Sequence, residues 1–142
     1  MNALRFADDA VRAQGLEVRR VSRPVQVVYL VAQLDFEMTT GGALQWLTNS
    51  SGRHARETVT ALHEIGADVC ARIVVEILAF FPNAHPAGPD DERLRQIEAL
   101  IPTAEPTWRD LCHRLTDWPE NVDALLRRYV AAHPSDFVNP RT

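Results

Sequence analysis

Asp35 and Glu37 are the residues best suited by type to carry out chemistry, because two neighbouring carboxylates can act as acid and base in a hydrolysis. They lie near the end of an apolar run and are followed by Gly41 and Gly42. Residues two positions apart on a helix point in different directions. This spacing favours a structural role in which one carboxylate hydrogen-bonds the glycine turn. A hydrolase that uses Asp35, Glu37 and a histidine is the catalytic alternative.

Other catalytic and metal-binding patterns are incomplete. His63 and Glu64 begin the His-Glu-x-x-His pattern of metalloproteases, but no second histidine stands four residues after His63. No Gly-x-Ser-x-Gly elbow and no glycine-rich phosphate loop occurs. The sequence contains no lysine, which excludes a lysine nucleophile. We therefore predict no catalytic residue, no metal site and no cofactor.

Two amides could form a binding surface. Gln45 and Asn49 are four residues apart, so both can lie on one helical face, with Trp46 between them. Polar amides beside an exposed aromatic side chain are typical of an interface. They are equally typical of a buried hydrogen-bonded network, and the sequence leaves both interpretations open.

The elements that must position these residues are helices. The chain has 142 residues, of which 46% are hydrophobic, enough for one domain with a single core. Apolar residues recur at helical spacing even in residues 25–38, where valines would also suit a strand. The sequence predicts an all-α fold, a single compact multi-helix domain of about six to eight helices. Expected helices cover residues 3–14, 25–38, 43–47, 55–66, 69–81, 90–101, 108–115 and 122–129, with Pro106 near the start of a separate helix.

We expect a division into an N-terminal helix and charged segment (1–24), a main helical domain (25–137) and a tail (138–142). The formal net charge is -4, which argues against direct binding of nucleic acid, since that needs a basic face. No apolar run approaches the length of a membrane span. Cys70 and Cys112 lie in apolar helical patterns and are expected to be reduced core thiols, which fits a cytoplasmic location.

The stretch LDFEMTTGGALQWLTNSSG, residues 34–52, resembles the signature of a bacterial family of helical domains that takes its name from a DNA-mimic protein. The similarity extends over residues 25–137. One departure is Thr40, which stands where the family usually has Asn before the two glycines, although its hydroxyl can still hydrogen-bond. The residues of this sequence that match the signature are Asp35, Glu37, Thr40, Gly41, Gly42, Gln45 and Asn49.

The resemblance implies an all-α fold that is often dimeric. In the best-known member of the family, an acidic surface imitates duplex DNA and occupies a DNA-binding regulator. Duplex DNA carries one charge per about 1.7 Å of its axis. The acidic residues of this chain are interspersed with arginines instead, so its charge does not by itself indicate mimicry.

We therefore expect a non-enzymatic protein-interaction module that binds and modulates another protein, with a DNA-binding regulator as one candidate partner. An immunity-type inhibitor of a toxin is the alternative. Trp46, with Gln45 and Asn49, forms a second candidate contact face. The acidic candidates for contact with a partner are Asp90, Asp91, Glu92, Glu120 and Asp123.

Overall fold

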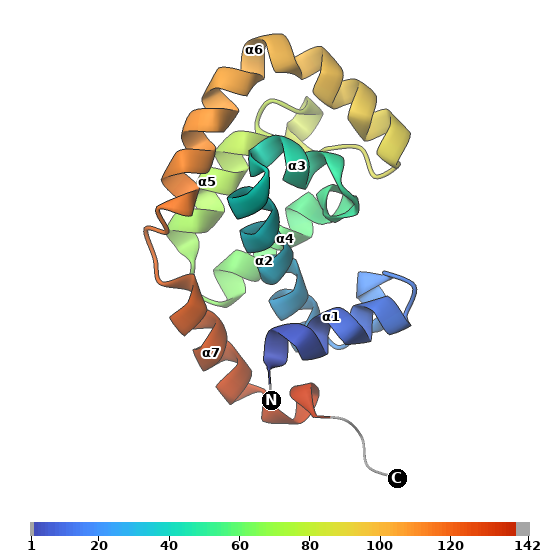
Figure 1. Ribbon diagram of the computed structural model, residues 1–142, viewed down its shortest axis with the longest axis vertical. Helices are drawn as coiled ribbons and strands as arrows, with labels where there is room; N and C mark the ends of the chain where they lie inside the picture. The colour runs from blue at the N-terminus through green and yellow to red at the C-terminus, as the bar shows by residue number, and fades with distance from the viewer. Residues whose placement is uncertain (1, 139–142) are drawn as a thin grey trace.

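Helices and the turns between them make up the chain in a computed structural model, which describes residues 2–138 except the side chains of Ser50 and Ser51 (Figure 1). The α-helices are α1 (Ala3–Ala13), α2 (Arg23–Thr40), α3 (Gly42–Thr48), α4 (Ala55–Glu64), α5 (Asp68–Leu78), α6 (Asp90–Thr116) and α7 (Val122–Ala132). Four short 3₁₀ segments are η1 (Val18–Arg20), η2 (Ser50–His54), η3 (Pro82–Ala84) and η4 (Pro134–Phe137).

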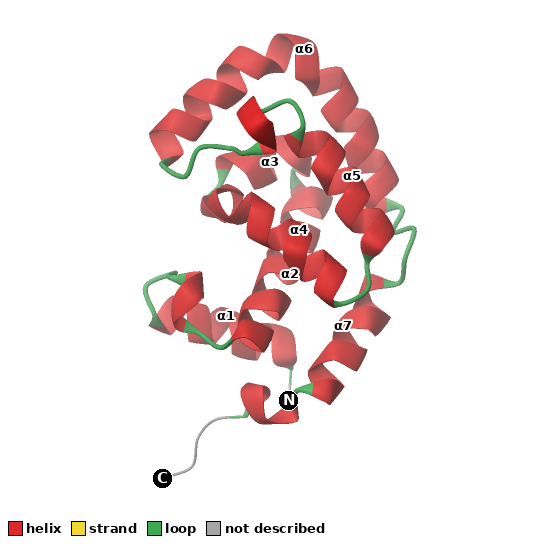
Figure 2. Cartoon of the chain, turned by 180° about the vertical axis from the view of Figure 1, so that it is seen from behind, coloured by secondary structure: helices red, strands yellow, loops and turns green. Residues whose placement is uncertain are grey.

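No strand occurs in residues 2–138, which confirms the all-α fold (Figure 2). The seven α-helices of this range agree with the expected number. Of the expected tail, residues 139–142 lie outside the described part of the chain. None of the described helices is long and apolar enough to cross a membrane.

Helix α2 lies at the centre of the fold and packs against α1, α3, α4, α6 and α7 (Figure 1). Pro24 suits its first turn, where the missing N–H is not needed. Val27, Val28 and Val31 are completely buried, so their packing outweighs the strand preference of β-branched residues. Because α2 is covered on several sides, even the carboxylate residue Glu37 is only 6% exposed.

Helix α5 is hydrogen-bonded at both ends by side chains that follow it in the sequence. At its start, the carboxylate of Glu120 accepts a 2.9 Å bond from the main-chain N–H of Cys70. At its end, the indole N–H of Trp108 donates a 2.9 Å bond to the carbonyl of Ile77. The first N–H and last C=O groups of a helix lack partners within it, so these two bonds satisfy groups that burial would otherwise penalise.

Helix α6 corrects one expectation, because it runs unbroken for 27 residues where two helices had been predicted. Pro102 and Pro106 lie inside it, four residues apart and both exposed. The carbonyls that lose a partner at these prolines therefore face solvent, and the opposite face remains packed through Ile97, Ala104 and Trp108. The helix arches over α3 and α5 (Figure 1).

Candidate functional site

The turn between α2 and α3 is built by the glycine-centred residues of the sequence. The hydroxyl of Thr40 donates to the carbonyl of Phe36 at 2.8 Å and accepts a 2.7 Å bond from Nε2 of Gln45. A Cβ at Gly41 would lie 1.8 Å from Oε1 of Gln45, so this close return of the amide needs a glycine. Gly42 has φ +77°, a conformation that favours glycine. The expectation that the Thr40 hydroxyl can hold the turn is confirmed.

Asn49 ties the end of α3 back to α2. Its Nδ2 donates a 2.9 Å hydrogen bond to Oε2 of Glu37. Gln45 and Asn49 thus both bond to side chains of α2. Of the two interpretations of these amides, the structure supports the hydrogen-bonded network. Trp46 is 0% exposed because α3 lies between α2 and α6. The assignment of Trp46 as a partner contact is therefore wrong.

The two carboxylates of the hydrolase alternative lie apart. Asp35 is exposed and accepts a 3.3 Å bond from Thr39, whereas Glu37 is buried against Asn49. They line different cavities, and no histidine lines either one among the described residues. The expectation that one of these carboxylates hydrogen-bonds the glycine turn is wrong. The hydroxyl of Thr40 holds the turn instead, through the carbonyl of Phe36 and the amide of Gln45.

The two cysteines do not form a disulfide. Cys70 and Cys112 are free thiols, the first buried and the second half-buried. Burial, together with the adjacent Glu120, raises the pKa of Cys70 to about 12, so this thiol stays protonated near neutral pH. Within residues 2–138 no three His, Cys, Asp or Glu side chains gather as a metal site would require.

A groove of about 710 Å³ lies between α2, the start of α7 and the loop that precedes α7. Phe36 stands in it with 60% of its surface exposed, and Leu4 with 43%. Trp118 borders the groove with a left-handed backbone (φ 47°), which costs a non-glycine residue about 1–2 kcal/mol. Strain of this kind is often kept at binding sites. The remaining apolar lining residues are Ala32, Val122 and Leu126.

Three carboxylates line the same groove, and two of them are sequence candidates for partner contact. They are Asp35, Glu120 and Asp123, and no arginine or histidine is among the described lining residues. Glu120 also holds the start of α5, and Asp123 pairs with Arg127 at 3.0 Å. The groove therefore combines exposed apolar side chains with acidic ones.

The other three acidic candidates begin α6. Asp90 lies 2.7 Å from Arg93, which lowers the pKa of that carboxyl, and Asp91 lies 3.4 Å from Arg95. Glu92 is exposed. A helix rises 1.5 Å per residue, so about 40 Å of helix path separates these residues from Glu120. The structure does not bring the five acidic candidates onto one face.

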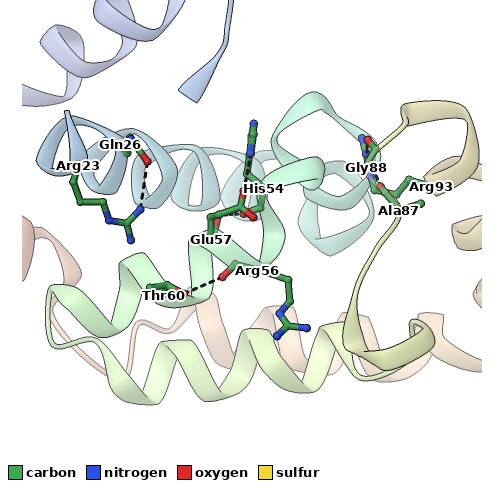
Figure 3. Close-up of polar contacts among 10 residues, drawn as sticks. Arg23, Gln26, His54, Arg56, Glu57, Thr60, Ala87, Gly88 and Arg93 are labelled. Atoms are coloured by element: carbon green, nitrogen blue, oxygen red, sulfur yellow. Dashed lines mark hydrogen bonds and ion pairs between the residues drawn. The ribbon is translucent and has the colours of Figure 1, made fainter. Parts of the chain in front are cut away.

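Arg93 is a key residue that the sequence analysis missed. It is 0% exposed and bonds the carbonyls of Ala87 and Gly88 at 3.1 and 2.8 Å (Figure 3). It thereby holds the loop before α6 in place. The burial of Arg93 could have been predicted from its position four residues before Ile97, which places both on the same, buried face of the helix.

Comparison with known proteins gives one match. The family model described as DMP19-like protein matches residues 19–133. No curated protein and no solved structure matches the chain.

Proposed function

The chain belongs to the DMP19-like protein family, a family of DNA-mimic proteins, and on this premise we propose that it is a non-enzymatic module that binds another protein through the groove between α2 and α7. The observation that supports this proposal is an exposed aromatic side chain, Phe36, in a groove that three carboxylates also line. Exposed apolar surface bordered by polar residues is typical of a protein-binding site.

The chemistry of the groove favours a basic, amphipathic segment of the partner. An amphipathic helix could lay its apolar face against Phe36 and Leu4, as helices do in hydrophobic grooves. Its basic residues would then meet Asp35, which pairs with no arginine of the described chain. Complementary charge of this kind steers association and selects between partners.

The charge distribution favours this groove over a DNA-like surface. Asp90, Asp91 and Asp123 each pair with an arginine of the same helix, which compensates their charge. A surface that imitates duplex DNA needs dense, uncompensated negative charge. Among partner classes, a DNA-binding regulator is favoured by the family, and a toxin is the second candidate; either can present a basic, apolar segment.

The test compares proteins captured from a lysate by the wild type, by Phe36→Ser and by Leu94→Ser. Leu94 is a matched control because it is 42% exposed on α6 and does not line the groove. A partner that the wild type and Leu94→Ser retain and Phe36→Ser loses would support the proposal. Equal recovery by all three proteins would contradict it.

The captured protein then identifies the partner class. A regulator should be displaced by its duplex DNA, and its binding should weaken at high salt because salt screens the carboxylates of the groove. A toxin should lose its activity in the complex. The chain itself would be captured if the groove instead joins two copies in a homodimer, which size-exclusion chromatography of the Phe36→Ser variant would then show as a monomer.

A further inference from the structure

A second, smaller pocket lies beside the groove on α2 and shares Phe36 with it. Its volume is about 500 Å³, within the usual range of small-ligand sites. The loop after α1 supplies one wall and the end of α3 supplies another. We call it the Glu37 pocket, and its lining residues are Arg12, Leu16, Tyr29, Gln33, Phe36, Glu37 and Asn49.

The pocket contains a buried carboxylate that no cation of the described chain pairs with. Glu37 is 6% exposed, and its one described bond is the 2.9 Å contact from Asn49 to Oε2. Arg12 also lines the pocket, but its Nε is 2.8 Å from Asp8. Oε1 of Glu37 has no described hydrogen-bond partner and is not among the buried unpartnered atoms, so it opens to the pocket and offers an acceptor to a positive group from outside.

Two further polar side chains of α2 line the pocket beside this carboxylate. Tyr29, Gln33 and Glu37 are spaced four residues apart, which places them in one row along the helix. Tyr29 is 8% exposed, and its hydroxyl has no hydrogen-bond partner within the described residues. Burial and then the charge of Asp8 raise the pKa of Tyr29, Arg12 opposes the shift, and Glu37 adds to it, so the hydroxyl stays neutral and can accept a further hydrogen bond.

Apolar side chains form the mouth of the pocket. Phe36 is 60% exposed and Leu16 is 40% exposed. Leu16 has a left-handed backbone (φ 65°), and together with Gly15 (φ 66°) it turns the chain after α1 toward α2. An aromatic face beside a carboxylate is a suitable environment for a flat cation, which can stack on the ring while its N–H groups reach the oxygens.

We propose that the Glu37 pocket binds a guanidinium group, which pairs with the carboxylate of Glu37, donates to the hydroxyl of Tyr29 and stacks against Phe36. Guanidinium is favoured over ammonium because its planar fork can bond a carboxylate and a neighbouring acceptor at the same time. The group could belong to a small molecule or to an arginine side chain of a partner protein. The second source would extend the proposed function, whereas the first would be independent of it.

The test is a titration of the purified protein with ethylguanidinium, followed by NMR through the side-chain amide signals of Gln33 and Asn49. Saturable shifts of these signals are expected, with a dissociation constant on the order of 1 mM. Glu37→Gln should weaken binding at least roughly tenfold, and Tyr29→Phe should weaken it by a smaller factor. Asp35→Asn is the matched control, because it removes one charge from the same helix but lines the other groove.

The outcomes separate the proposal from its alternatives. Equal binding by wild type and a folded Glu37→Gln, or equal binding of ethylammonium, would overturn it. If Glu37→Gln does not fold, unchanged binding by Tyr29→Phe would overturn it. Two further ligands identify the source: N-acetyl-arginine-N-methylamide should bind as well as ethylguanidinium if the natural ligand is an arginine side chain, and worse if it is a small molecule. Phe36 lines both the groove and the Glu37 pocket, so loss of a partner by Phe36→Ser does not separate the two proposals. Asp35 lines only the groove and Glu37 only the pocket, so Asp35→Asn and Glu37→Gln separate them.

Discussion

The Nε atom of Arg93 donates a 2.7 Å hydrogen bond to the carbonyl oxygen of Leu47, which lies 46 positions earlier in the chain. Nη2 of the same guanidinium bonds the carbonyl of Asn49 at 3.0 Å and Asp90 at 2.7 Å, and Nη1 bonds the carbonyls of Ala87 and Gly88. A guanidinium has five N–H donors, and here five acceptors meet them. This explains how a charged side chain can be fully buried in the fold.

Replacement of Arg93 by Met should therefore destabilise the protein strongly. The variant leaves the carbonyl of Leu47 and its neighbours buried without a donor, and loss of one side of a buried charged network costs roughly 3–5 kcal/mol. Urea unfolding measures this change. Arg95→Met is the control. Because the Arg95 side chain is 71% exposed, this substitution should lower the free energy of unfolding by less than about 1 kcal/mol. Equal effects of the two substitutions would show that the Arg93 contacts contribute little to stability.

The sequence was sufficient for the fold class because helical spacing is a local property. Residues 25–38 show this most clearly, since their apolar positions follow the helical period although their valines prefer strands. It was not sufficient at Pro102 and Pro106. Whether a proline ends a helix depends on which face it occupies, and that is set by packing against α3 and α5.

The candidate site was harder to predict for the same reason. The types and spacing of Gln45 and Asn49 allowed an exposed face or a buried network, and only the position of α3 between α2 and α6 decides between them. That position also buries Trp46. The groove beside Phe36 joins α1, α2 and α7, which are distant in sequence, so no local pattern could have indicated it.

The turn between α2 and α3 gives a second prediction, which concerns Gly42. A Cβ at this position would meet nothing closer than Sγ of Cys112 at 3.7 Å, so space is not the constraint. The constraint is the backbone angle φ of +77°, which an alanine adopts only at a cost. Gly42→Ala should therefore lower the free energy of unfolding by about 1–2 kcal/mol. Thermal or urea unfolding measures it.

Gly88→Ala is the control for this substitution. Gly88 has open space around its Cβ position, and it is not among the residues with positive φ. Its change to alanine should alter stability by less than about 1 kcal/mol, because only the entropy of the unfolded chain differs. A cost at Gly88 as large as that at Gly42 would mean that the left-handed conformation is not the cause.

The third prediction concerns pH and the contact between His54 and Glu57 at the start of α4 (Figure 3). Nδ1 of His54 lies 2.8 Å from Oε2 of Glu57, and the hydrogen bond from this histidine lowers the pKa of the carboxyl below its ordinary value of 4.5. A carboxyl with a lowered folded-state pKa stabilises the protein above its unfolded-state pKa. That stabilisation is lost as the pH falls through the folded-state value.

Wild type should therefore be more stable than Glu57→Gln by about 0.5–1 kcal/mol near pH 6, and the two should converge as the pH falls below 4.5 toward the lowered pKa. Urea unfolding at a series of pH values measures the difference. Glu98→Gln is the control, because Glu98 is exposed and makes no ion pair with a described residue; its difference from wild type should stay near zero throughout. A difference at Glu57 that does not change with pH would show that the contact acts through packing and not through the charge of the carboxylate.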